Sequence, residues 1–180
     1  MSATSTDGGT ATGVELLPSD WREQVRQLAD ERDAVILAHN YQVPEIQDIA
    51  HHTGDSLGLS RVAAQVEAST IVFCGVHFMA ESVALLAGPE QAVWITNPKA
   101  GCTMEMLAKD HLVQPIADQL LARYGDDLLV VAYMNTSGRI KALAGRTGGA
   151  VCTSSNADKV VRWARKQNKK IFFVPDQHLG

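Results

Sequence analysis

The sequence predicts an α/β protein made of repeated three-layer α/β/α units with short parallel sheets, and three observations predict this class. Short apolar runs alternate along the chain with longer amphipathic stretches, an order typical of parallel sheets with helical crossovers. Polar clusters follow the apolar runs directly, at the strand ends where such sheets bind ligands. The order of elements also begins again near the middle of the chain, which indicates an internal repeat.

The first half of the chain contains three predicted strands and four predicted helices. Ser19 is a candidate N-cap for the first helix, and Pro44 lies near the start of the second. The strands are apolar and short, as expected for buried parallel strands. They cover 34–38, 70–74 and 92–96, and the helices cover 16–32, 44–52, 54–66 and 78–86.

The second half repeats this alternation, preceded by two short helical segments. Its strands are again apolar and end at polar residues. Helices are predicted over 104–109, 115–124, 140–144 and 157–167, and strands over 127–133, 150–152 and 170–174.

Comparison of the two halves gives a weak internal repeat. Residues 36–39 match 130–133 at an offset of 94, and 71–74 match 149–152 at an offset of 78. The same offset of 78 places 92–96 over 170–174. Each half is therefore expected to run strand, helix, strand, helix, strand.

The predicted organisation has three parts. Residues 1–13 are small and polar and are expected to form a disordered tail. A first α/β/α domain is expected over 14–110, and a second, incomplete one over 111–180.

Composition limits the classes of function. The chain has 180 residues, 46% of them hydrophobic, which is enough for one ordinary domain or two small ones. A formal charge of -4 without any basic run argues against binding to nucleic acid or to an anionic membrane. No export signal and no apolar run of roughly 18 residues is present, so a cytoplasmic protein is expected.

Three cysteines in a protein without an export signal argue against disulfides. Cys74 and Cys152 lie within apolar runs and are predicted to fill the core. Cys102 lies in a loop just before a predicted helix, whose N-terminus would favour a thiolate. It is either a metal ligand or a surface thiol at a cap position.

His39 and Tyr41 follow the first strand at alternate positions and therefore face the same side. Such a pair can bind a carboxylate and transfer protons, or it can consist of a capped histidine and a packing tyrosine. Tyr133 and Asn135 repeat this spacing in the second half.

Ser56 and Ser154 each precede a predicted helix. Either serine can be an ordinary N-cap. Alternatively, its hydroxyl and the adjacent helix N-terminus can contact an anionic ligand. Neither segment has the Gly-Lys-Ser/Thr ending of a phosphate-binding loop for nucleotides, so nucleotide binding is not implied.

Seven ordered motifs make the chain resemble the iron–sulfur quinolinate synthase A family, specifically its N-terminal part. The resemblance covers about residues 30 to 180. The motifs are 38–42 (AHNYQ), 54–57 (GDSL), 73–81 (FCGVHFMAE), 98–102 (PKAGC), 133–137 (YMNTS), 152–156 (CTSSN) and 175–180 (PDQHLG).

The resemblance implies three pseudo-equivalent α/β/α domains around a [4Fe–4S] cluster held by one cysteine from each domain. It implies condensation of iminoaspartate with dihydroxyacetone phosphate to quinolinate in NAD biosynthesis, with a possible coupling to an L-aspartate oxidising enzyme. By resemblance, Cys102 is a cluster ligand, Tyr41 assists proton shifts and His39 holds a substrate carboxylate. The residues implied to contact substrate are His39, Ser56, Tyr133, Asn135 and Ser154.

The sequence also departs from the family pattern. The family's other two cluster cysteines match positions past Gly180, so this chain alone is expected to contain two of three domains and to be inactive. Residues 145–149 (GRTGG) add a few residues to the commoner pattern. The roles of Asp176, Gln177 and His178 stay open.

Two other functions remain. The chain can be a non-catalytic α/β module that binds a phosphorylated metabolite at its helix N-termini. It can also be a cluster-free phosphosugar aldolase or isomerase, although no candidate catalytic lysine follows a predicted strand.

Overall fold

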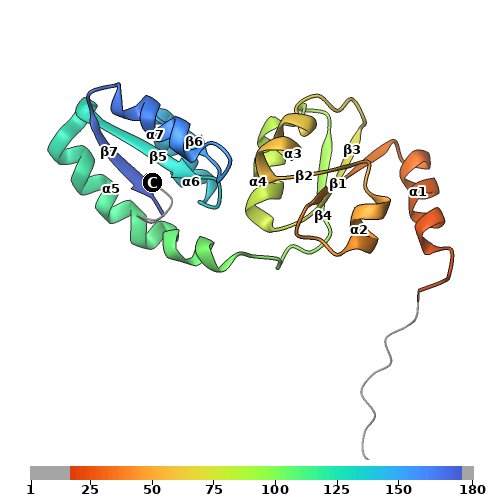
Figure 1. The fold of residues 1–180 in the computed structure, drawn as a ribbon. Helices are drawn as coiled ribbons and strands as arrows, with labels where there is room; N and C mark the ends of the chain where they lie inside the picture. Colours follow the sequence, from red (N-terminus) through yellow and green to blue (C-terminus); the bar gives the residue numbers. More distant parts are fainter. Residues whose placement is uncertain (1–16, 176–180) are drawn as a thin grey trace, which may run out of the picture.

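The computed structural model describes residues 17–175, which form two parallel sheets with helices on both faces (Figure 1). The α/β class with short parallel sheets is therefore confirmed. The residues of the predicted tail, together with Asp176, Gln177 and His178, lie outside the described part of the chain.

The first sheet has four strands in the order β2-β1-β3-β4, and the second has three in the order β6-β5-β7. The strands are β1 (Ala34–His39), β2 (His52–Gly54), β3 (Thr70–Cys74), β4 (Ala92–Ile95), β5 (Leu128–Tyr133), β6 (Ala150–Cys152) and β7 (Lys170–Val174). The α-helices are α1 (Trp21–Glu31), α2 (Pro44–Ile49), α3 (Ser56–Ala63), α4 (His77–Leu86), α5 (Asp110–Tyr124), α6 (Gly138–Arg146) and α7 (Ala157–Arg165). Two 3-10 helices, η1 (Thr103–Ala108) and η2 (Gly125–Asp127), flank α5. We call the elements from α1 to β4 the first sheet unit and those from α5 to β7 the second.

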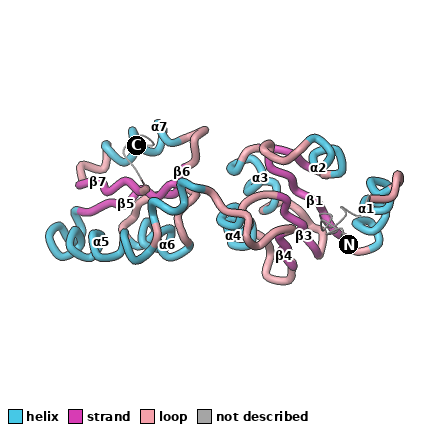
Figure 2. Tube along the Cα trace, turned by 90° about the horizontal axis from the view of Figure 1, so that it is seen from below, coloured by secondary structure: helices cyan, strands magenta, loops and turns pink. Residues whose placement is uncertain are grey.

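Alternating side chains of the central strands build a core on each face of each sheet. In β1, Leu37 packs with residues of α3 and α4, whereas Ile36 and Ala38 pack with residues of α1 and α2. In β5, Val130 faces α5 and α6, and Val131 faces α7. Figure 2 shows the second sheet between α7 on one side and α5 and α6 on the other.

The internal repeat is present, but two of the predicted matches between strands of the two halves are wrong. β1 pairs with β2 and β3 in the same register in which β5 pairs with β6 and β7. The equivalent of β6 is therefore β2, not β3, and the equivalent of β7 is β3, not β4.

This error arose because β2 was not recognised as a strand. It consists of His52, Thr53 and Gly54 at the edge of the sheet, with its first two residues exposed. A polar strand of three residues has no apolar run for a sequence pattern to detect. The predicted helix over 44–52 accordingly ends at Ile49.

Several helix starts also differ from the predictions. Asp20, not Ser19, precedes α1, and its side chain forms no capping hydrogen bond. The α-helix predicted to begin at Pro115 begins at Asp110, so that Pro115 lies inside α5. The segment predicted as a helix over 104–109 is the 3-10 helix η1.

Candidate functional site

All seven predicted site residues line one cavity of about 200 Å³ between the two sheet units. They come from the carboxyl ends of β1 and β5, from the segments after β2 and β6, and from the loop after β4. The structure therefore brings all seven together in one cavity, while their chemical roles are a separate question. The seven are His39, Tyr41, Ser56, Cys102, Tyr133, Asn135 and Ser154.

The two sheet units present these residues through the same backbone geometry. Asn40 donates its backbone N–H to the carbonyl of Gly54 at 3.0 Å, and Met134 donates its own to the carbonyl of Cys152 at 2.8 Å. Each bond ties the end of the central strand to the edge strand beside it. His39 and Tyr133, Tyr41 and Asn135, and Ser56 and Ser154 therefore occupy equivalent positions.

His39 is nearly fully buried, and both of its ring nitrogens have neighbours. Nδ1 accepts the backbone N–H of Tyr41 at 3.2 Å, and Nε2 lies 3.4 Å from the hydroxyl of Ser56. Because Nδ1 is an acceptor, the proton of the neutral ring belongs on Nε2. Burial lowers the pKa of His39, and the nearby negative charge of Asp55 raises it by less.

Tyr41 lies at the mouth of the cavity. Its ring meets that of His39 edge to face, with 4.5 Å between the ring centroids, and 88% of the residue is exposed. Its hydroxyl is therefore accessible to a ligand entering the cavity.

Neither predicted serine cap is the cap of its helix. The carboxylate of Asp55 caps α3 by accepting the backbone N–H of Gly58 at 2.7 Å. Asn156 precedes α7, and its side-chain oxygen accepts the backbone N–H of Thr153 at 2.7 Å. The hydroxyls of Ser56 and Ser154 are therefore not committed to capping and can serve a ligand.

Asn135 carries an unmatched acceptor in this cavity. The residue is only 2% exposed, and its Oδ1 has no hydrogen-bond partner among the residues the structure describes. A buried acceptor without a partner costs about 1–3 kcal/mol. A ligand hydroxyl or amine that donates to Oδ1 would recover that cost.

The three cysteines have different surroundings, as predicted. Cys74 and Cys152 are buried in the cores of the two sheets, and burial raises both thiol pKa values, that of Cys152 to about 11. Cys102 is half-buried and lines the cavity. The helix after it is η1, so the argument from an α-helix N-terminus does not hold for its thiol.

The loop that carries Cys102 is held in place by local hydrogen bonds. The side-chain oxygen of Asn97 accepts a hydrogen bond from the backbone N–H of Lys99 at 2.9 Å. The carbonyl of Ala100 accepts one from the backbone N–H of His77 at 2.8 Å. Within 17–175, no group of three metal-ligating side chains gathers. Among the described residues, Cys102 is the one cysteine that lines the cavity.

The sequence analysis missed several residues that line the cavity. Four of them are adjacent to a predicted residue along the chain, two lie in the first turn of α4, and Met104 lies two residues after Cys102, and this proximity was the available signal. They are Asn40, Asp55, Phe78, Met79, Met104, Met134 and Thr153.

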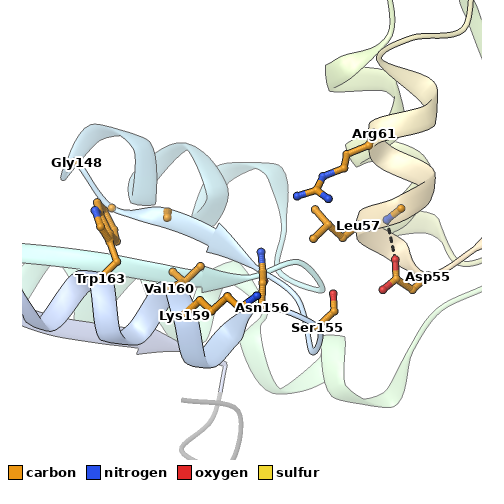
Figure 3. Close-up of a pocket in the computed structure, with 12 residues that line it drawn as sticks. Asp55, Leu57, Arg61, Gly148, Ser155, Asn156, Lys159, Val160 and Trp163 are labelled. Carbon is orange, nitrogen blue, oxygen red and sulfur yellow. Dashed lines mark hydrogen bonds between the residues drawn. The ribbon is translucent and has the colours of Figure 1, made fainter.

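A second, larger cavity of about 710 Å³ lies between α3 and α7 (Figure 3). Arg61 and Leu57 extend from α3 into this open groove, opposite Lys159 and Trp163 of α7. None of the seven predicted residues lines it. Convergent polar groups and a buried histidine distinguish the smaller cavity, which is the candidate site.

Comparisons with known proteins point to one family. The sequence profile described as "Quinolinate synthetase A protein" matches residues 23–180. A curated protein named quinolinate synthase from Halalkalibacterium halodurans is 42% identical over 175 residues, 91% of this chain and 48% of its own length. Its namesake from Mycolicibacterium paratuberculosis is 45% identical over 184 residues, all of this chain and 48% of its own.

A protein of the same name from a Geobacillus strain is 49% identical over 146 residues, 81% of this chain and 40% of its own length. The chain thus spans a little under half the length of these curated relatives. Within the described residues, no helix is long and apolar enough to cross a membrane.

Proposed function

The chain belongs to the quinolinate synthetase A family, and we propose that it provides part of the active site of a quinolinate synthase. The reaction would join iminoaspartate to dihydroxyacetone phosphate and release quinolinate, phosphate and water. The observation that carries this proposal is the convergence of the seven motif-derived residues on one cavity formed by both sheet units.

The polar groups of the cavity suit anionic substrates that also carry hydroxyl or imine groups. The Nε2–H of His39 and the hydroxyls of Ser56 and Ser154 can donate to carboxylate or phosphate oxygens. The unmatched Oδ1 of Asn135 can accept from a substrate hydroxyl or imine N–H. Tyr133, in the position equivalent to His39, supplies a further hydroxyl.

Proton transfer is proposed for Tyr41. Its ring meets that of His39 edge to face, and the residue lines the cavity and is largely exposed. A phenol can both give and take a proton during the enolisation and dehydration that ring formation requires. Neutral His39 fixes the Tyr41 backbone through Nδ1 and keeps Nε2–H for a carboxylate.

We propose that Cys102 is one ligand of a [4Fe–4S] cluster. It is the one cysteine of the described part that is exposed to the cavity, and the two others are thiols held in sheet cores. A single thiolate cannot hold such a cluster, so further ligands must come from outside residues 17–175. When bound, a cluster with one open iron would supply Lewis-acid assistance to loss of water.

The wider setting is part of the same proposal. The chain would form two of three pseudo-equivalent domains, over 14–110 and 111–180. Its three free thiols fit a reducing compartment, so we propose a cytoplasmic location. Functional coupling to an L-aspartate oxidising enzyme would supply iminoaspartate.

The test is quinolinate formation by the complete product of the gene, purified without oxygen and given both substrates. Growth rescue of a quinolinate auxotroph by the same gene is the matching test in cells. Binding of dihydroxyacetone phosphate without turnover, in a preparation with a full cluster, would favour the non-catalytic binding module instead.

A further inference from the structure

Lys141, on α6 of the second sheet unit, reaches across to α4 of the first. Its ammonium donates to the hydroxyl of Ser82 at 3.0 Å and to the carbonyl of Phe78 at 3.5 Å. The Ser82 hydroxyl in turn donates to the same Phe78 carbonyl at 2.9 Å. Among residues 17–175, the two bonds of Lys141 are the only hydrogen bonds that join the two sheet units.

Lys141 is half-buried at this contact, which is an unusual place for an ammonium group. Burial lowers its pKa, and the charges of Glu81 and Glu105 raise it by less. It forms no ion pair within the described part of the chain, so neutral oxygens and the Phe78 ring, 6.0 Å away, hold it. An ammonium that is partly buried without an ion pair loses hydration, and an apolar side chain would avoid this cost in a contact whose only role was packing.

The residues that Lys141 holds also form the wall of the candidate site. Phe78 and the adjacent Met79, in the first turn of α4, line the cavity. Met134, which follows β5, lines the cavity and also borders a separate apolar space of about 260 Å³ beside Lys141 and Ser82. The hydrogen bonds thus lie directly behind the wall where the two sheet units meet.

We propose that Lys141 is a positioning residue that acts through Ser82 and Phe78 to set the spacing between the two halves of the site. His39 and Ser56 belong to the first unit, and Tyr133 and Asn135 to the second, so a shift of α4 relative to α6 moves one set against the other. For reactions that join two substrates, a misplacement of about 1 Å can cost about a hundredfold in rate. The effect on turnover rests on the proposed function, whereas the contact itself does not.

The experiment compares Lys141→Met, Ser82→Ala and the double variant in the complete gene product, with Lys166→Met as the control. Met keeps the length of the lysine stem and removes its donors, and Lys166 is an exposed lysine at the end of α7. Hydrogen exchange of peptides covering α4 and α6 is measured together with kcat, KM and melting temperature.

We expect faster exchange in both peptides for Lys141→Met and Ser82→Ala, with Lys166→Met unchanged. We also expect kcat to fall about tenfold in Lys141→Met at temperatures where the protein stays folded, since alignment of reacting groups is lost. The double variant should be no worse than Lys141→Met, because both changes break the same connection. Ser82→Ala removes one oxygen and keeps the test valid if Lys141→Met fails to fold.

The proposal is overturned if exchange in α4 and α6 matches the control, or if the two single effects on kcat multiply. A lower melting temperature with unchanged kcat would show a stabilising role only and would also overturn it. If the unaltered protein forms no quinolinate, the proposed function fails, and the exchange comparison still decides whether Lys141 holds the two units together.

Discussion

At the scale of single residues, His39 shows how burial and fixed partners set a protonation state. Its Nδ1 is occupied by the backbone N–H of Tyr41, and burial lowers its pKa. The folded protein therefore favours the neutral ring, which donates only through Nε2. A bound carboxylate would reverse part of this shift, since a negative charge beside the ring stabilises the imidazolium.

The lowered pKa predicts a loss of stability toward acid. The unfolded chain, with an ordinary pKa of 6.5, takes up a proton at a higher pH than the folded one. Unfolding is therefore favoured as pH falls below about 6.5, and the contribution is constant above about pH 7.5. His39→Asn keeps an acceptor near the Nδ1 position but does not titrate.

Melting temperatures of the two proteins between pH 5 and 8 measure this effect. The unaltered protein should lose more stability toward pH 5 than His39→Asn. Parallel curves would show that His39 is not held neutral, and an NMR titration of the ring would give its pKa directly.

Thiol chemistry should separate Cys102 from the two core cysteines. Native protein without a cluster should take up one iodoacetamide, at Cys102, because the other two thiols are buried and have raised pKa values. Mass spectrometry locates the label, and denatured protein should label at all three. In the complete gene product, Cys102→Ala should abolish iron retention and Cys152→Ala should not. Native labelling at Cys152 would contradict this picture.

Tyr41→Phe tests the proposed proton transfer. The phenyl ring can keep its edge contact with His39, so structure and iron content should stay unchanged. Loss of a positioned acid–base group should lower kcat by about a hundredfold or more. Iron content and quinolinate formation are measured on the same preparation, and unchanged turnover would remove Tyr41 from the mechanism.

At the scale of elements, the turn from β2 into α3 separates stability from ligand binding. Asp55 caps α3, whereas the neighbouring Ser56 faces the cavity and lies near His39. Replacing an N-cap aspartate by alanine costs about 0.5–2 kcal/mol of stability. Asp55→Ala should therefore lower the midpoint of urea unfolding.

Ser56→Ala is the matched variant one residue away. It should leave the urea midpoint nearly unchanged and raise KM for at least one substrate. If Ser56→Ala lowers stability and Asp55→Ala does not, Ser56 rather than Asp55 is the N-cap of α3.

At the scale of the whole molecule, the two sheet units close a cavity to which neither contributes all of the polar groups. Residues 17–175 bring one cysteine to it. Reconstitution of residues 1–180 alone with iron and sulfide should therefore yield neither a stoichiometric cluster nor quinolinate. Iron and sulfide analysis of the anaerobic product checks this. One cluster per chain would show that a core cysteine can become a ligand.

The sequence by itself determined the α/β class and the long strands, and it proposed the residues of the candidate site. β1 and β5 are continuous apolar runs that can be recognised as buried strands, and each ends in a polar motif. The family motifs then singled out the seven residues, since each motif occurs in the family's order along the chain.

Only the tertiary structure decided which strands of the two halves are equivalent. It also decided which polar residues cap a helix and which face the cavity. β2 is recognisable as a strand only through its pairing with β1, because three polar edge residues carry no hydrophobic signal. Asp55 and Ser56 are both ordinary cap residues in sequence, and only backbone geometry assigns the cap to one of them. The contact of Lys141 with Ser82 joins residues 59 positions apart. No local pattern encodes such a contact, since it depends on how the two sheet units pack together.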